Sequence, residues 1–478
     1  MRMSPTGERV ARRISHVAVV MMFVLLLVAT GIVASPRSTA SASPRRGVVA
    51  PNIVLIVTDD QRSDTLWAMP NVRRDLVKHG VSFSNAFVVN PICCPSRASI
   101  LTGLYSHSTG VYSNKGEFGG FGAFDPRSTV ATWLHDDGYR TALIGKYLNG
   151  YTGTGTPPGW DEFDAFNEVP ESGLYYDYSM NVNGVVKNFG SARADYSTRV
   201  LGGLASTFIA SSPDPFFLYL APRAPHAPAT PALRDRRTFR DLPPYRPPSY
   251  NEKAVADKPS WVRHRGRLSM QQRKAIDAFR LHQYRSLLAV DRMVDNLVDQ
   301  LREAESLDNT MIIFMSDNGI LWGEHRLQGK GLPYEESIRV PMVIRYDPLV
   351  AAPLVDKHLA LNIDIAPTVA ALAGVVPPDP VEGKNLLRLL DGSASAWRDH
   401  FLIEHLGGSA PPSYCAVRGK RFVYVAYGSG EEEFYDLRRD PWELRSRPDD
   451  YPKRRAQYLT WLQQLCQPPP PGYTPPAG

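Results

Sequence analysis

The residues best suited to chemistry lie between Cys93 and Gly103, where two adjacent cysteines, a proline, a serine and an arginine precede an apolar run. Proline suits the first turn of a helix because it has no N–H to lose there, so this segment is predicted to begin a helix. The unpaired N–H groups of that turn attract anions, and a nucleophile placed there would face a bound anion. From the residues alone, Cys93 and Cys94 are equally consistent with two buried small side chains or a fragment of a metal site.

A second group of residues offers oxygen ligands after two continuous apolar runs, which are typical of strands buried on both faces of a parallel sheet. The group consists of Asp59 and Asp60 after residues 52–58, and Asp317 and Asn318 after residues 310–315. Because ligands gather at the carboxyl ends of strands in open α/β sheets, these side chains are predicted to hold a cation. An all-oxygen set suits calcium or magnesium and not zinc, and calcium is preferred because several protein ligands converge. One aspartate of the first pair could instead cap the next helix.

Two further polar residues stand beyond predicted strands. Lys146 follows the strand predicted within residues 138–148, and His226 lies in a Pro-His-Ala-Pro segment after the strand at residues 216–221. A lone lysine after a strand is usually solvated, and a histidine among prolines is by default a surface loop residue. Both nevertheless lie beyond a strand, as the oxygen ligands do.

The elements that position these residues indicate an α/β protein with a large mixed, mostly parallel sheet between helices. The clearest helix repeats apolar residues at spacings of three and four along one stripe, at Leu287, Val290, Val294, Leu297 and Leu301. Further helices are predicted at residues 69–80, 128–137 and 451–465. Residues 149–200 are predicted to be loops with short strands, and residues 229–266 a long loop or lid.

The pattern changes near residue 397, where short runs with hairpin-like spacing predict a small antiparallel sheet with one helix. The predicted strands are residues 401–404, 414–418, 421–427 and 433–436. The domain boundaries that follow are an export signal and linker at 1–50, a catalytic domain at 51–396, the antiparallel-sheet subdomain at 397–466 and a Pro-rich tail at 467–478. Outside the cell, a Cys415–Cys466 disulfide could close this C-terminal region, the alternative being two isolated thiols.

Residues 1–50 contain seven arginines and one acidic residue, which accounts for the whole net charge of +6. The rest of the chain is balanced, so nothing indicates a nucleic-acid partner. The pair Arg12-Arg13, an apolar run at 17–34 and the small residues at 40–42 predict a cleaved export signal of the twin-arginine kind. The competing interpretation is an uncleaved anchor, which would be the protein's contact with a membrane. Either way the protein is expected to be exported and secreted or associated with the cell envelope.

The segment from Cys93 to Gly103 resembles the signature of type I sulfatases. Four further blocks resemble that family in its order, over about residues 51–465. They are residues 138–148, Pro225-His226-Ala227-Pro228, residues 323–341 and residues 433–443. The resemblance implies an alkaline-phosphatase-like fold and hydrolysis of sulfuric esters. It also implies a formylglycine-generating enzyme as a partner during maturation, because Cys93 would be oxidised to formylglycine.

In such an enzyme the hydrated formylglycine at Cys93 is the nucleophile and completes the calcium site. Arg97, Lys146 and Lys330 would neutralise the sulfate oxygens, and His226 or Lys330 would protonate the leaving alcohol. Many members carry a histidine two residues beyond the first lysine. Here that position is Leu148, so the resemblance assigns no base there.

The cysteine doublet and the Gly145–Asn149 segment are most similar to the N-acetylglucosamine-6-sulfatase branch. This implies a 6-sulfated amino sugar or sulfated glycan as substrate, with aryl sulfates as surrogates. One alternative is a phosphate monoester, diester or phosphonate hydrolase of the same superfamily. Another is an inactive glycan-binding homologue, against which the retention of every metal and lysine candidate argues.

Overall fold

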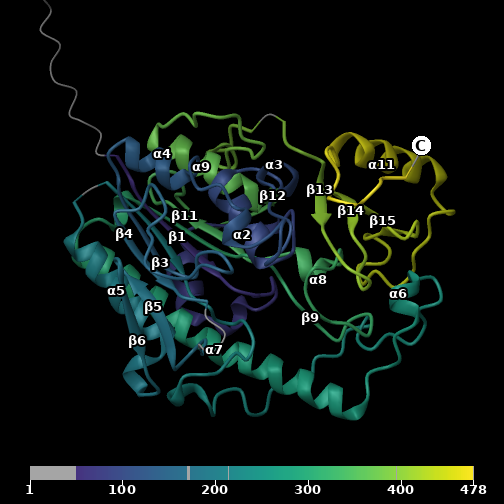
Figure 1. Cartoon of the computed structure of the whole chain (residues 1–478), viewed down its shortest axis with the longest axis horizontal. Helices are drawn as coiled ribbons and strands as arrows, with labels where there is room; N and C mark the ends of the chain where they lie inside the picture. The colour runs from purple at the N-terminus through teal and green to yellow at the C-terminus, as the bar shows by residue number, and fades with distance from the viewer. Residues whose placement is uncertain (1–49, 169–172, 214, 395, 477–478) are drawn as a thin grey trace, which may run out of the picture. The chain divides into compact units, whose positions relative to one another are not determined.

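A ten-stranded mixed sheet runs through the protein (Figure 1). The computed structural model describes residues 50–168, 173–213, 215–394 and 396–476. The strands of this sheet are β1 (Asn52–Thr58), β2 (Val81–Phe87), β3 (Arg140–Gly145), β4 (Glu162–Phe166), β5 (Tyr178–Val182), β6 (Val185–Phe189), β7 (Phe216–Ala221), β8 (Thr310–Ser316), β11 (Met342–Arg345) and β12 (Leu354–Leu361). Their order is β12-β2-β11-β8-β1-β7-β3-β4-β5-β6. β8, β1, β7, β3 and β4 are parallel, whereas β11, β5 and β6 are antiparallel to their neighbours. The predicted α/β class with a mixed, mostly parallel sheet is confirmed.

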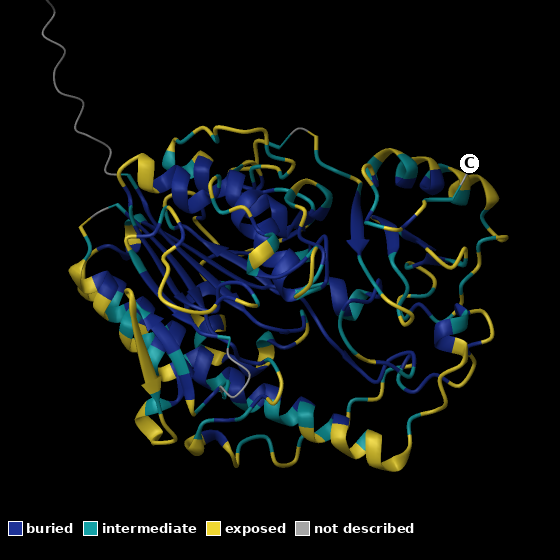
Figure 2. Ribbon diagram, in the orientation of Figure 1, coloured by how far each residue is buried: buried dark blue, intermediate teal, exposed yellow. Residues whose placement is uncertain are grey.

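Helices cover both faces of this sheet, and β1 shows why its strands are continuously apolar. Ile53, Leu55 and Val57 pack in one buried cluster, while Val54 and Ile56 pack in another on the opposite face. The first cluster includes residues of α2 (Cys93–Thr102), α4 (Val130–Asp136) and α9 (Ile365–Ala373), and the second includes residues of α5 (Ser197–Ser211) and α7 (Met270–Glu303). Figure 2 shows the strands buried between these helices. Successive side chains point to opposite faces, so burial of both faces requires an apolar residue at every position.

The apolar stripe predicted from residue 287 to residue 301 belongs to α7, and all five of its residues are buried. Ser269 begins the helix with a capping box, because its hydroxyl accepts from the Gln272 N–H and the Gln272 side chain accepts from the Ser269 N–H. The first turns of α7 extend past the sheet and are exposed in Figure 2. The helix therefore acts mainly as packing for one face of the sheet.

The other helical elements before residue 397 are short. They are α1 (Pro70–Val72) with a π-helical turn at Arg73–Val77, α3 (Ser106–Thr109), α6 (Ser260–Arg263), α8 (Glu335–Ile338) and α10 (Leu387–Leu390), besides 3₁₀ turns. Residues 229–266 contain little regular structure, as predicted. In residues 149–200, the structure goes further than the prediction, because β4, β5 and β6 extend the main sheet. β6 is an edge strand with a largely exposed pattern, so its sequence lacks the apolar run of a buried strand.

The C-terminal region contains a separate four-stranded antiparallel sheet and a helix, as predicted. Its elements are β13 (His400–His405), β14 (Tyr414–Gly419), β15 (Phe422–Tyr427), β16 (Glu432–Asp436) and α11 (Pro452–Leu465). A disulfide joins Cys415 in β14 to Cys466 at the end of α11, which confirms the predicted pairing. Tyr473 in the Pro-rich tail is buried and donates a hydrogen bond to the Ala426 carbonyl at 3.0 Å. The tail therefore packs on this sheet.

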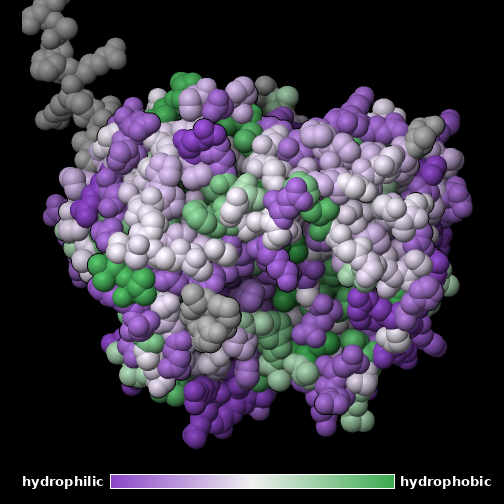
Figure 3. Space-filling view, in the orientation of Figure 1, coloured by the Kyte–Doolittle hydropathy of each residue, from purple (hydrophilic) through white to green (hydrophobic). Residues whose placement is uncertain are grey.

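Hydrophilic residues cover most of the face drawn in Figure 3, and a hollow opens near its middle. The predicted export signal lies outside the described residues. Within the described ranges, no helix combines the length and the apolar character needed to cross a membrane.

Candidate active site

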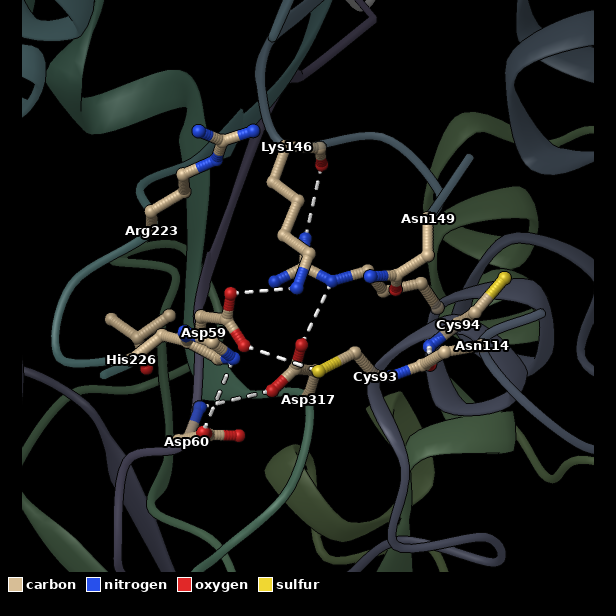
Figure 4. A network of polar contacts seen from close by, with 12 residues as sticks. Asp59, Asp60, Cys93, Cys94, Asn114, Lys146, Asn149, Arg223, His226 and Asp317 are labelled. Atoms are coloured by element: carbon tan, nitrogen blue, oxygen red, sulfur yellow. Dashed lines mark hydrogen bonds and ion pairs between the residues drawn. The ribbon is translucent and has the colours of Figure 1, made fainter. Parts of the chain in front are cut away.

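Four adjacent parallel strands deliver the predicted site residues to one edge of the main sheet. Their carboxyl ends lead into the segments that carry Asp59 and Asp60 (β1), Lys146 (β3), His226 (β7), and Asp317 and Asn318 (β8). The N-terminus of α2 brings Cys93 to the same edge, and Figure 4 shows Asp59, Cys93 and Asp317 pointing towards one another. Loops leaving the carboxyl ends of parallel strands meet in one place, which is why residues so distant in sequence converge.

The centre of the site is a buried acidic cluster. Ligand atoms of Asp59, Asp60, Asp317 and Cys93 all lie within 4.8 Å of one another. The Asp60 N–H donates to Asp317 Oδ1 at 3.2 Å, and the Asn318 side-chain amide donates to Asp60 Oδ1 at 2.7 Å. Asp60 has a positive φ of 65°, a conformation that L-residues seldom adopt, so its position is held by these contacts against local strain.

These residues fit a hard cation. Asn318 Oδ1 is buried and has no hydrogen-bond partner among the described residues. The amide nitrogen of the same side chain donates to Asp60, so this oxygen lies close to the acidic cluster. An unpaired buried oxygen beside three carboxylates is the donor set that calcium prefers. Asp59, Asp60, Asp317, Asn318 and the residue at position 93 would therefore hold the ion.

Two lysines balance the acidic cluster. Lys146 Nζ lies 2.7 Å from Asp59 Oδ2, and Lys330 Nζ lies 2.5 Å from Asp60 Oδ1 and 2.6 Å from Cys93 Sγ. Burial opposes the charge of both lysines, but Asp59 beside Lys146 and Asp60 beside Lys330 hold both pKa values above their usual range. Both side chains therefore remain positively charged at the centre of the site.

Cys93 lies between these charges. Its thiol donates to Asp59 Oδ1 at 3.3 Å. The pKa of the thiol is raised mainly by burial and, to a smaller extent, by repulsion from the Asp59 carboxylate. An unmodified thiol here stays protonated and is a poor nucleophile, because only the thiolate attacks readily. The first turn of α2 is supported from outside the helix, since the Cys94 N–H donates to Asn114 Oδ1 at 2.9 Å.

Arg97 stands behind the acidic cluster, and its side chain is 0% exposed. Its Nε donates to Asp317 Oδ2 at 2.8 Å and its Nη1 donates to the Lys146 carbonyl at 3.0 Å. The guanidinium thus ties the loop after β3 to the loop after β8. This geometry suits a residue that holds Asp317 and Lys146 in place.

His226 is the most solvent-accessible of the predicted site residues, with 31% of its side chain exposed. Its Nδ1 donates to the Ala227 carbonyl at 2.7 Å, because a carbonyl oxygen can only accept. The other ring nitrogen, Nε2, lies 3.8 Å from Asp60 Oδ2 and faces the site. His226 can therefore present either a lone pair or a proton to a molecule bound beside the cluster.

Comparison with known proteins defines the family of this chain. A family model described as Sulfatase matches residues 51–375, and one described as N-sulphoglucosamine sulphohydrolase, C-terminal, matches residues 323–464. The chain belongs to the sulfatase family. This assignment agrees with the resemblance of its motifs to type I sulfatases.

Two curated sulfatases illustrate the similarity. Human N-acetylglucosamine-6-sulfatase is 32% identical over 412 residues, covering 78% of this chain and 73% of the human protein. The Caenorhabditis elegans protein named putative extracellular sulfatase Sulf-1 homolog is 34% identical over 373 residues, covering 74% of this chain. The alignment spans only 52% of that relative, about half its length.

A solved structure shows the same fold. It is described as BT4656 in complex with its substrate D-glucosamine-2-N,6-O-disulfate, and it aligns with a TM-score of 0.78 at 23% sequence identity. The alignment covers 87% of this chain and 98% of that one. At this identity the likeness establishes the fold of this chain and nothing about its substrate.

The chain departs from the family pattern at Leu148, which is 1% exposed and packs in the apolar cluster on the α2 face of the sheet. No proton can be exchanged at that position. Sequence reasoning also passed over two residues near the site, Asn114 and Arg223. Arg223 lies two residues after β7, where the strand end was a usable signal, and its guanidinium packs 4.3 Å from the Phe166 ring centre. Asn114 had no comparable signal, because its contact is with a helix 20 residues away.

Proposed function

We propose that the protein is an exported sulfatase that hydrolyses sulfate esters of a sulfated sugar, with 6-sulfated N-acetylglucosamine in a glycosaminoglycan as the first expected substrate. The observation that carries this proposal is the convergence of Cys93 with three aspartates and two lysines at one buried point. The names of the human and nematode relatives and the disulfated glucosamine ligand of the solved structure support the substrate class. Residues 51–396 would form the catalytic domain and residues 397–466 the C-terminal subdomain.

Two groups are required for this function. Formylglycine made from Cys93 would supply the nucleophile as a hydrated aldehyde, and calcium held by Asp59, Asp60, Asp317 and Asn318 would supply positive charge that polarises the sulfate. A formylglycine-generating enzyme would act on the Cys93 segment during maturation. Burial and the neighbouring Asp59 raise the pKa of the Cys93 thiol, which supports a conversion that supplies a better nucleophile.

Charge counting explains why the site suits a sulfate ester. The carboxylates of Asp59, Asp60 and Asp317 are matched by Arg97 and the two lysines. A bound divalent ion therefore leaves two positive charges, which a sulfate monoester anion and a negatively charged nucleophile would offset. Fixed positive charges in a buried site stabilise the charge that develops during transfer.

The side chains divide the remaining work. Lys146 and Lys330 would bind the sulfate oxygens, and Lys330 would also contact the group at position 93, because its Nζ lies 2.6 Å from Cys93 Sγ. His226 is the proposed acid for the leaving alcohol, since its Nε2 faces the site while part of its ring reaches solvent. Arg97 contributes by positioning Asp317 and the Lys146 backbone.

The test is mass spectrometry of the tryptic peptide that carries Cys93, combined with a sulfate-release assay on the same sample. We expect the aldehyde at position 93 and sulfate release from 6-sulfated N-acetylglucosamine or an aryl sulfate. Cys93→Ala should abolish turnover, whereas Cys94→Ala is the matched control and should keep both conversion and activity.

Three results would contradict the proposal. An unmodified Cys93 together with undiminished activity in Cys93→Ala would exclude the nucleophile. Faster hydrolysis of phosphate or phosphonate esters than of any sulfate ester would favour the related hydrolase class. Binding of sulfated glycan with no release of sulfate, despite a converted Cys93, would favour an inactive glycan-binding protein.

A further inference from the structure

A second cluster of metal-ligating side chains lies outside the candidate active site. Ligand atoms of His325, Glu336 and Glu443 lie within 4.8 Å of one another. His325 precedes the loop that carries Lys330, Glu336 lies in α8 after that loop, and Glu443 follows β16 in the C-terminal region. His325 and Glu443 are buried and Glu336 is half-buried. The three residues therefore join segments that are distant in sequence.

Two atoms of this cluster have no hydrogen-bond partner among the described residues. They are His325 Nε2 and Glu336 Oε2, and both are buried. Unpaired buried polar atoms are costly, so two of them within one group point to a ligand that satisfies both. The cluster is thus more than a set of acidic residues.

The orientation of His325 is that of a metal ligand. Its Nδ1 lies 2.8 Å from Glu252 Oε2, and the ring stacks on Tyr334 with ring centres 4.2 Å apart. When Nδ1–H donates to the Glu252 carboxylate, Nε2 keeps a lone pair. A histidine held by a carboxylate in this way is the usual arrangement around protein-bound metals.

Among the residues that the structure describes, the two glutamates of the cluster have no ion-pair partner of their own. Neighbouring carboxylates have arginine partners, Glu324 with Arg62 at 2.7 Å and Glu335 with Arg418 at 2.9 Å. In the described part of the chain neither Glu336 nor Glu443 forms an ion pair.

Lys258 is a nearby cation whose charge acts on Glu443 and His325, but it forms no ion pair with the carboxylate of Glu336 or Glu443. It donates instead to the Tyr435 hydroxyl and to the backbone carbonyl of Glu443. The Glu443 carboxylate accepts the Glu335 N–H at 3.0 Å, which leaves lone pairs for a further ligand. A cation bound at this point would be paired by both carboxylates.

We propose that His325 Nε2 and the carboxylates of Glu336 and Glu443 bind one divalent transition-metal ion, with zinc the best fit, and that Glu252 orients the histidine. One imidazole nitrogen and two carboxylates suit zinc, whereas the all-oxygen set at the active site suits calcium. Glu336 also lines a cavity of about 710 Å³, which gives this residue contact with solvent.

The consequence of such an ion is positional. His325 and Glu336 stand at the two ends of the loop that carries Lys330. One ion bound by both would therefore link the ends of this loop. Through the same ion, Glu443 would connect this loop to the C-terminal sheet region, which lies beside α8 in Figure 1. Zinc would therefore stabilise the placement of Lys330 without touching the reacting atoms.

The experiment titrates the full purified chain with ZnCl₂ in calcium-containing buffer and measures retained zinc by inductively coupled plasma mass spectrometry after desalting. We expect one zinc per wild-type chain and none in Glu336→Gln. Glu252→Gln should weaken zinc binding about 10–100-fold, as is usual for a residue that orients a metal ligand. Glu335→Gln is the matched control, because it alters the adjacent carboxylate of the same cavity but should retain zinc.

A second measurement separates loss of zinc binding from misfolding of a variant. Zinc should raise the unfolding temperature of the wild type, followed by circular dichroism, but not that of Glu336→Gln or His325→Gln. A wild-type chain that retains no zinc above a desalted blank would overturn the proposal. Equal retention in wild type and Glu336→Gln would also overturn it. If zinc has no effect and Glu336→Gln is as stable as wild type, Glu336 and Glu443 share a proton instead.

Discussion

Replacement of Asp317 by asparagine is expected to damage both the stability and the activity of the protein. Asp317 accepts hydrogen bonds on both carboxylate oxygens, from Arg97 Nε at Oδ2 and from the Asp60 N–H at Oδ1. An asparagine amide can accept at only one of these positions. In either orientation of the amide, its NH₂ group would face another donor.

The cost in stability follows from the burial of this pair. Both Arg97 and Asp317 have 0% exposed side chains, so water cannot replace the lost carboxylate. Removing one partner of a buried ion pair costs about 3–5 kcal/mol, a large part of the roughly 5–15 kcal/mol that stabilises a typical protein. If Asp317 also holds the calcium ion, a loss of about 3 kcal/mol of transition-state stabilisation would lower kcat about 100-fold in the folded fraction.

The assay combines urea unfolding with turnover of an aryl sulfate at increasing calcium concentrations. Asp364→Asn is the matched control, because Asp364 is equally buried and pairs with Arg398, with Nη2 and Oδ1 2.6 Å apart. We expect both variants to lose stability, and Asp317→Asn alone to lose turnover per folded molecule.

Two outcomes would refute this reasoning. Wild-type stability in Asp317→Asn would contradict the cost assigned to the buried pair. Wild-type kcat with an unchanged calcium requirement would contradict the metal assignment, even if the variant were less stable.

Three other predictions concern separate regions. Lys330→Met should lower kcat about 100-fold in steady-state assays, because it removes one fixed charge from the buried site, and an unchanged kcat would argue against its contact with the reacting group. Replacing both cysteines of the Cys415–Cys466 disulfide by alanine should cost about 4 kcal/mol in urea unfolding, since the bridge closes a separation of 51 residues. Burial opposes the charge of His107, but hydrogen bonds to Glu382 and Glu404 raise its pKa to about 9. The protonated His107 should therefore contribute to the free energy of unfolding in full below pH about 6.5, and this contribution should be lost as pH rises through 9. In His107→Gln, the free energy of unfolding measured against pH should no longer show this decrease.

Much of the fold could be predicted because the relevant information is local. The apolar runs that form β1 and β8 are continuous since both faces of the sheet are covered, and the stripe along α7 follows the period of a helix. The strand ends also indicated which residues could meet. β6 escaped prediction as part of the sheet because it is an exposed edge strand held by backbone pairing with β5.

The sequence by itself determined the type of site. Cysteine, aspartates and lysines after apolar strands specify a nucleophile, an oxygen-rich metal site and anion-binding charges, and their motifs specify the family. These features depend on residue type and short spacing, which a single chain records directly. The catalytic roles assigned to them remain predictions.

The tertiary structure decided which of these residues touch. Only the order β8-β1-β7-β3 brings Asp317, Asp59, His226 and Lys146 to one edge, and only packing places Arg97 behind Asp317. The cluster around His325 was equally hidden, because its ligands come from separate segments. Such contacts depend on residues far apart along the chain, whose energies no local pattern of the sequence encodes.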